Sequence, residues 1–229
     1  MIVTFGKGYL CCGCKIRYTK RKTAFIYKEN CICKECYEKF EAYSNSAYFE
    51  AAGNVDYLAP AFRYKNLYRE IFLNFKFNSH VAYGHLLGMA IAEQMKTRDE
   101  ITGYSYIIPV PVSKERFNER GYNQSEVLAD YVSKSMGIPM ITSLKRVKHS
   151  APQSTVESAM RAENVKGAFI TDREFSGENV ILFDDIFTTG STVAECAKTL
   201  QKAGAGKICA ISGAYNQVSF IDRTIHRFI

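Results

Sequence analysis

The chain has 229 residues, of which 47% are apolar and 23% are charged, a composition of folded globular proteins that excludes a disordered chain. No apolar run approaches the ~20 residues of a transmembrane helix, and the first residues lack the pattern of a secretion signal, so we expect neither membrane insertion nor secretion. The formal net charge is +7, and residues 1–40 hold six of these charges, with nine basic and three acidic side chains. We therefore predict one large domain with a small basic appendage.

The appendage contains two C-x2-C pairs separated by eighteen residues. The pairs are Cys11 with Cys14 and Cys33 with Cys36. Two such turns supply the four thiolates of a tetrahedral zinc site, so we predict a zinc-binding module over residues 1–40. Forty residues cannot bury a stable core alone, so we expect the metal to stabilise the fold of this module. Disulfides are the alternative, and Cys12 and Cys31 are further candidate ligands.

A basic stretch lies between the two cysteine pairs, and Lys20, Arg21 and Lys22 are its centre. Three aromatic residues are interleaved with it: Tyr18, Phe25 and Tyr27. Positive charge beside exposed aromatic rings suits single-stranded nucleic acid, through phosphate attraction and base stacking. The alternative is a solvated basic loop whose aromatic rings pack onto the main domain. The sequence leaves both open.

Residues 41–60 are small and polar with scattered aromatic residues, which predicts a connector, and residues 61–229 then form the main domain. Apolar residues at helical spacing predict helices over about 64–77 and 81–96. The apolar run 106–110 ends at a proline and predicts a short buried strand.

The strand is followed by residues 111–121, a predicted polar loop that carries Lys114, Arg116 and Arg120. Ligands of open α/β sheets bind beyond the carboxyl ends of the strands, so these side chains are predicted to meet an anion. A solvated loop with local ion pairs is the alternative. A helix is predicted over about 123–136, and a further basic patch, Lys145–Lys148, is a second candidate contact for nucleic acid.

The strongest signal lies in residues 179–192. The apolar run Val180–Phe183 predicts a strand buried on both faces, and it leads directly into Asp184 and Asp185. Thr188–Thr192 then form a turn before the next helix, where backbone N–H groups and hydroxyls can hold a phosphate. The carboxylates suit vicinal sugar hydroxyls and Mg²⁺. We predict a ribose-5-phosphate site, because a phosphate turn stands beside carboxylates that suit a sugar diol. The alternatives fit less well: no Walker motif is present, a receiver-type aspartate pair lacks the phosphate turn, and an ordinary strand–turn–helix does not explain two adjacent aspartates.

Residues 181–192 resemble the motif by which type I phosphoribosyltransferases bind 5-phosphoribosyl 1-pyrophosphate (PRPP). The whole chain resembles the ComF family of competence-associated proteins. The matching segments are the paired cysteines, Arg63–Phe77, Pro109–Pro111 with Arg116, residues 120–124, Pro152 with Gln153, Arg161 with Asn164 and Val165, and the aspartate motif.

The resemblance implies an α/β fold: a type I phosphoribosyltransferase-like parallel sheet flanked by helices, with a small N-terminal four-cysteine zinc module. It also implies a cytoplasmic protein that serves DNA uptake in natural transformation, with single-stranded DNA and the uptake machinery at the inner membrane as partners. Asp184 and Asp185 would be the catalytic pair that holds the ribose hydroxyls and the Mg²⁺ environment. Thr188, Thr189, Gly190, Ser191 and Thr192 would bind the 5-phosphate. Lys114, Arg116 and Arg120 would face the pyrophosphate.

Purine-type phosphoribosyltransferases often have an acidic residue where this chain has Thr188. Threonine is neither a general acid nor a general base near neutral pH, so nucleobase chemistry of that kind is not implied. Two other hypotheses stay open at this point. One is an active phosphoribosyltransferase with an unknown acceptor, and the other is a PRPP sensor that does no chemistry.

Overall fold

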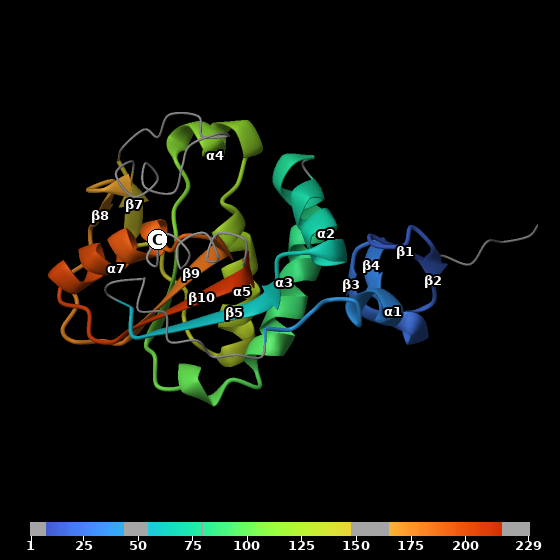
Figure 1. Ribbon diagram of the computed structural model, residues 1–229, viewed down its shortest axis with the longest axis horizontal. Helices are drawn as coiled ribbons and strands as arrows, with labels where there is room; N and C mark the ends of the chain where they lie inside the picture. The colour runs from blue at the N-terminus through green and yellow to red at the C-terminus, as the bar shows by residue number, and fades with distance from the viewer. Residues whose placement is uncertain (1–7, 44–54, 79, 148–164, 217–229) are drawn as a thin grey trace, which may run out of the picture.

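The computed structural model describes residues 8–43, 55–78, 80–147 and 165–216. At its centre is a sheet of four parallel strands in the order β5-β10-β9-β6 (Figure 1). The strands are β5 (Tyr57–Arg63), β6 (Tyr106–Pro109), β9 (Val180–Phe187) and β10 (Ile208–Tyr215). Consecutive residues of β9 face opposite sides, with Val180 and Leu182 in one core cluster and Ile181 and Phe183 in the other. A strand buried on both faces explains the unbroken apolar run.

Helices cover both faces of this sheet. The helices α2 (Asn66–Phe77), α3 (Val81–Met95) and α5 (Gln124–Met136) share a core with one face. The helix α7 (Ser191–Lys202) packs on the other face, beside the antiparallel pair β7 (Leu144–Arg146) and β8 (Phe169–Thr171). The predicted fold class, a parallel sheet flanked by helices, is confirmed.

The predicted helices and strands of the main domain are confirmed within one or two residues at most ends. The Asn123 side chain caps α5 by accepting a hydrogen bond from the Ser125 N–H at 3.1 Å. Strand β9 extends beyond the predicted run, because Asp184 and Ile186 still pair with β10. The two aspartates are therefore part of the strand itself.

The structure differs from the prediction most clearly in residues 111–121. The sequence predicts a loop there, whereas the structure has the helix α4 (Lys114–Arg120). Ser113 caps its first turn by accepting from the Arg116 N–H, and Gly121, with φ of +78°, ends it. None of its residues is buried, so the helix has no apolar stripe and its sequence gives no helical periodicity.

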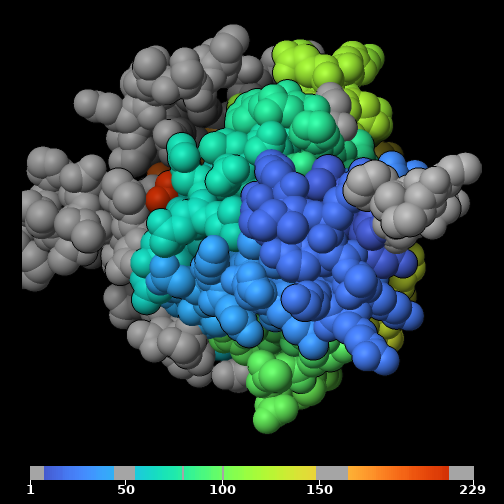
Figure 2. Space-filling model, turned by 90° about the vertical axis from the view of Figure 1, so that its right-hand side faces the viewer, coloured from blue at the N-terminus to red at the C-terminus, as the bar shows by residue number. Residues whose placement is uncertain are grey.

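The N-terminal module is a second, smaller sheet, in the order β2-β1-β4-β3. Its elements are β1 (Tyr9–Cys11), β2 (Arg17–Tyr18), the 3₁₀ turn η1 (Lys20–Lys22), β3 (Thr23–Tyr27), β4 (Asn30–Cys33) and α1 (Lys34–Tyr37). The module packs against α3 and shares a core cluster with it, and Figure 2 shows it covering that end of the molecule.

The boundaries 1–40, 41–60 and 61–229 stay a prediction. Much of the predicted connector, residues 44–54, lies outside the described residues. Strand β5 begins at Tyr57, so the central sheet starts a few residues before position 61. A short 3₁₀ turn, η3 (Asp99–Ile101), precedes β6. Among the described residues, no helix combines the length and the apolar character needed to cross a bilayer.

Candidate functional site

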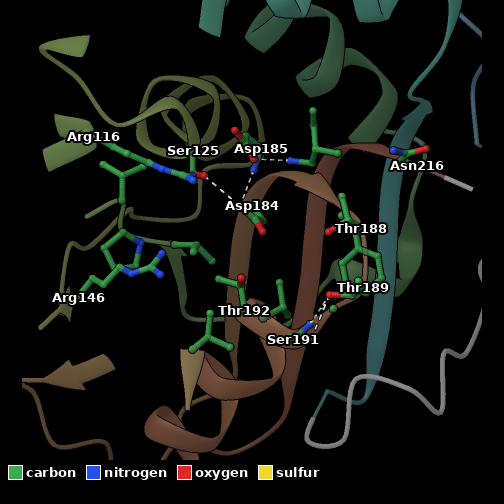
Figure 3. Close-up of a pocket in the computed structure, with 18 of the residues that line it drawn as sticks. Arg116, Ser125, Arg146, Asp184, Asp185, Thr188, Thr189, Ser191, Thr192 and Asn216 are labelled. Carbon is green, nitrogen blue, oxygen red and sulfur yellow. Dashed lines mark hydrogen bonds between the residues drawn. The ribbon is translucent and has the colours of Figure 1, made fainter. Parts of the chain in front are cut away.

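A cavity of about 350 Å³ lies at the carboxyl end of β9, and Figure 3 shows the side chains around it. Its walls come from α2, β7, β9, the segment from β6 into α5, and the first turn of α7. The polar and charged residues among its lining are Tyr64, Lys76, Arg116, Arg120, Ser125, Arg146, Asp184, Asp185, Thr188, Thr189, Ser191, Thr192 and Asn216. The cavity therefore brings together both aspartates, the whole Thr188–Thr192 turn and two of the three cations predicted to meet an anion.

The two aspartates are held by hydrogen bonds and by one ion pair. Asp184 Oδ1 accepts from the Asp185 N–H at 2.9 Å and from the Ser125 hydroxyl at 3.3 Å. Asp185 Oδ1 accepts from the Ile186 N–H at 2.7 Å, and Asp185 Oδ2 pairs with Lys76 Nζ at 3.1 Å. These contacts fix both carboxylates at the cavity wall, so their oxygens are positioned before any ligand arrives.

The two carboxylates differ electrostatically. Burial raises the pKa of Asp184 to about 7, and the neighbouring charge of Asp185 contributes in the same direction. The Lys76 ammonium and the Ser125 hydroxyl act against this increase. Asp184 thus changes charge near neutral pH. A cation or a set of hydroxyl donors would favour its ionised form, and carboxylate oxygens are the donors that Mg²⁺ prefers, so the pair fits that ion.

The phosphate turn lies at the N-terminus of α7. Gly190 precedes the helix with a φ of +78°, and a Cβ at this position would lie 2.7 Å from Cζ of Phe187. Ser191 and Thr192 are the first helical residues, and the Thr189 and Ser191 hydroxyl oxygens lie 3.0 Å apart. A helix N-terminus with hydroxyls beside it favours an anion such as phosphate. The Glu195 carboxylate of α7 accepts a hydrogen bond from the Gly167 N–H at 2.7 Å.

Of the residues that the structure describes, four cations line the cavity against two carboxylates: Lys76, Arg116, Arg120 and Arg146. Burial and the nearby Arg116 lower the pKa of both Arg120 and Arg146, so a multiply charged anion would relieve their mutual repulsion. Arg120 donates to Gln124 Oε1 at 3.1 Å. Lys114, the third predicted cation, is exposed on α4 and is not among the lining residues.

Sequence reasoning did not assign Lys76, Ser125 or Arg146 to the site. Lys76 stands between apolar residues of α2 and is 109 positions from its partner Asp185. Arg146 was grouped with the Lys145–Lys148 patch as a candidate DNA contact, whereas its side chain lines the cavity. Lys145 pairs with Asp172 at 2.6 Å. Lys148 of that patch lies outside the described residues, as do four residues of the segments that resemble the family: Pro152, Gln153, Arg161 and Asn164.

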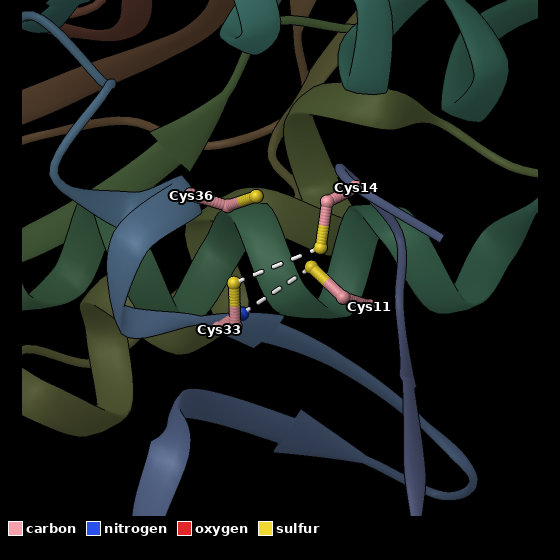
Figure 4. Close-up of side chains that lie close together, drawn as sticks. All are labelled: Cys11, Cys14, Cys33 and Cys36. Atoms are coloured by element: carbon pink, nitrogen blue, oxygen red, sulfur yellow. Dashed lines mark hydrogen bonds between the residues drawn. The ribbon is translucent and has the colours of Figure 1, made fainter. Parts of the chain in front are cut away.

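The four paired cysteines converge in the N-terminal module (Figure 4). The sulfur atoms of Cys11, Cys14, Cys33 and Cys36 all lie within 4.8 Å of one another, and those of Cys14 and Cys33 are 3.9 Å apart. Tetrahedral zinc with Zn–S bonds of about 2.3 Å requires sulfur separations of roughly 3.8 Å, so the cluster fits that ion. Cys31 is buried outside the cluster and contacts the Tyr9 carbonyl. The geometry thus selects these four cysteines and not Cys31, and four thiolates leave no position for a catalytic water.

The basic stretch is exposed, but its aromatic rings are not free. Lys20, Arg21 and Lys22 form the exposed turn η1. Tyr27 stacks on His85 of α3 at a centroid distance of 3.9 Å, and Phe25 meets Tyr37 edge to face at 4.9 Å. Tyr18 contacts the Cys14 sulfur through its hydroxyl. The alternative in which these rings pack is therefore the one that the structure favours.

Several proteins of known name are similar to this chain. Competence protein F of Haemophilus influenzae is 37% identical over 127 residues, which are 54% of this chain and 55% of that protein. DNA utilization protein YhgH of Escherichia coli K12 is 33% identical over 103 residues, 44% of this chain and 45% of that protein. Competence protein ComFC of Streptococcus pneumoniae is 26% identical over 151 residues, 66% and 64% of the two chains. The matches with the first two span about half of those proteins.

No family model matches the chain. Among solved structures, adenine phosphoribosyltransferase of Leishmania tarentolae is 15% identical, with 67% of each chain covered and a TM-score of 0.38. Glutamine PRPP amidotransferase of B. subtilis is 19% identical, with 57% of this chain and 26% of that one covered and a TM-score of 0.39. The fold itself is a four-stranded parallel sheet flanked by helices, with a four-cysteine cluster near the N-terminus.

Proposed function

We propose that the chain is a member of the ComF family of competence-associated proteins and a cytoplasmic factor that binds PRPP and single-stranded DNA during DNA uptake. The names of the relatives support a role in competence or DNA utilisation. The chemistry of the cavity supports PRPP as the ligand. In this proposal the N-terminal module holds a structural zinc ion and Mg²⁺ accompanies PRPP.

One observation carries the PRPP proposal: a single cavity combines the α7 N-terminus, two carboxylates and four cations. PRPP has a phosphate for the helix N-terminus, a pair of ribose hydroxyls for Asp184 and Asp185, and a pyrophosphate for Arg116 and Arg120. Lys114 does not reach the cavity, so Lys76 and Arg146 replace it as candidates for the remaining negative charge.

Direct contact with DNA is proposed for Lys20, Arg21 and Lys22. Their exposure in one turn makes them accessible to phosphate groups. Reversing all three charges should weaken binding of an oligothymidylate and reduce the slope of log affinity against log salt concentration. An unchanged affinity and an unchanged slope would remove this turn from the proposal.

Isothermal titration with PRPP and Mg²⁺ tests the cavity. Wild type should bind at one site, and Asp184→Asn should bind tenfold or more weakly, because hydrogen bonds to a charged group contribute about 1.5–3 kcal/mol. A pyrophosphate-release assay on the same samples separates binding from turnover. Release that depends on an added acceptor would identify a transferase, whereas binding without release would identify a sensor. No binding by the wild-type chain would refute the PRPP proposal.

A further inference from the structure

Two exposed aromatic rings belong to α2 and α4, the helices that supply Lys76, Arg116 and Arg120 to the cavity wall, and no part of the function described so far uses them. Phe77, the last residue of α2, is 64% exposed, and Phe117, in the middle of α4, is 48% exposed. An exposed large apolar side chain bordered by charged residues is a candidate for a binding surface. Figures 1 and 2 both show α4 beside the C-terminal end of α2.

The C-terminal ends of α2 and α4 are connected by a hydrogen bond and by stacked rings. The Tyr122 hydroxyl, just after α4, donates to the Phe75 carbonyl, and the two rings stack at a centroid distance of 5.3 Å. At the ends of the same two helices, Cζ of Arg120 lies 5.6 Å from the centroid of the Phe77 ring. Phe77 is thus held beside an arginine that also lines the cavity. We call Phe77 and Arg120 the rim patch.

The rim patch has the chemistry that binds a nucleotide of a single strand. An exposed phenyl ring stacks on any base, and a neighbouring guanidinium meets the adjacent phosphate. A duplex hides the faces of its bases, so the ring selects single strands. The aromatic residues of the zinc module do not fill this role, because Tyr27 and Phe25 are engaged by His85 and Tyr37.

The positive charge near Phe77 also favours single-stranded DNA as the ligand of the rim patch. Arg116 and Arg120 are four residues apart on α4 and both turn toward the cavity, whereas Glu115 and Glu119 of the same helix are exposed. Lys76 lies next to Phe77 in the sequence and also lines the cavity. The ring therefore borders a surface that attracts phosphate.

We propose that the rim patch is a base-stacking site for single-stranded DNA at the entrance to the PRPP cavity. The proposal rests on the proposed DNA-binding function and adds a second contact to that of residues 20–22. Arg120 belongs to both sites, so a stacked nucleotide and PRPP are neighbours on this chain.

The test uses the absence of tryptophan from the sequence. Phe77→Trp introduces a single indole, and stacking of a base should quench its fluorescence when oligothymidylate is added. Phe77→Ala should bind a labelled oligothymidylate about tenfold more weakly in fluorescence anisotropy, with an unchanged salt slope because no charge is removed. Ile170→Ala, which removes another exposed apolar side chain on β8, should bind as the wild type does.

Two further measurements sharpen the result. An oligonucleotide of the same length made of abasic sites should bind wild type and Phe77→Ala equally, because it offers no base to stack. PRPP affinity of Phe77→Ala should equal that of wild type, because Phe77 is not among the residues that line the cavity.

Wild-type affinity in Phe77→Ala, or an indole whose emission is unchanged while anisotropy reports binding, would overturn the proposal and leave the DNA-binding function intact. Failure of the wild-type chain to bind any oligonucleotide would overturn both. Sedimentation that shows Phe77→Ala abolishing a dimer would assign the rim patch to self-association instead.

Discussion

Replacing Asp184 with asparagine should change how the stability of the protein depends on pH. The pKa of Asp184 is raised from 3.8 to about 7 by burial and by Asp185, so the folded chain holds a proton that the unfolded chain releases. The free energy of unfolding therefore falls as pH rises from about 4 to about 7. Asparagine keeps the shape and the acceptor oxygen for the Asp185 N–H but does not ionise.

The magnitude follows from the shift. The interval from 3.8 to about 7 is about three pH units, and each unit corresponds to about 1.4 kcal/mol. At pH 8, Asp184→Asn should be more stable than wild type by up to about 4 kcal/mol, and at pH 4 the two should be nearly equal.

Urea denaturation at a series of pH values measures this difference, with Asp172→Asn as the matched control. The pKa of Asp172 is lowered by Lys145, so this carboxylate stabilises the wild type at neutral pH and loses that effect as pH falls. The difference for Asp172→Asn should thus have the opposite sign. Parallel stability profiles for wild type and Asp184→Asn would refute the assignment of the raised pKa.

Three further predictions concern the site and the module. Gly190→Ala should lower the free energy of unfolding in urea by more than the roughly 1–2 kcal/mol that a left-handed alanine costs, because its Cβ meets Phe187. Gly177→Ala, at a φ of +88° with open space around it, should cost only that strain, and equal losses would contradict the contact. In the wild type, PRPP–Mg²⁺ affinity should rise as pH increases through about 7, where Asp184 ionises. Lys76→Met removes the ammonium that lowers the pKa of Asp184, so the affinity of this variant should rise only at a higher pH. Chelation of zinc should make the backbone amides of residues 8–43 exchange faster, because the metal stabilises the fold of the module. Cys31→Ala should retain bound zinc, because Cys31 lies outside the sulfur cluster. Loss of zinc from the Cys31→Ala variant would contradict this set of ligands.

The sequence predicts those parts of the site that are contiguous in the chain. Asp184, Asp185 and the phosphate turn follow one apolar run, so their order alone places them at the end of a buried strand. The helices α2 and α5 are predictable because each buries an apolar stripe, and α3 is predictable because it is apolar over most of its length.

Two kinds of feature are not predicted by the sequence: contacts that form only in the tertiary fold, and a helix that is exposed to solvent. Lys76 and Ser125 reach the aspartates from 109 and 59 positions away, and nothing in their local pattern marks them. Helix α4 was missed because it buries no residue and its end caps alone define it. The packing of Tyr27 on His85 likewise appears only when the module docks on α3.

Hydrogen exchange in the presence of PRPP and Mg²⁺ tests most directly that this cavity is the PRPP site. Addition of the ligand should slow amide exchange in Thr188–Thr192 and at the start of α7, since these N–H groups would bind its phosphate. The zinc module should exchange at the same rate with and without PRPP. Protection that spares Thr188–Thr192 and appears elsewhere, or no protection at saturating PRPP, would contradict the account.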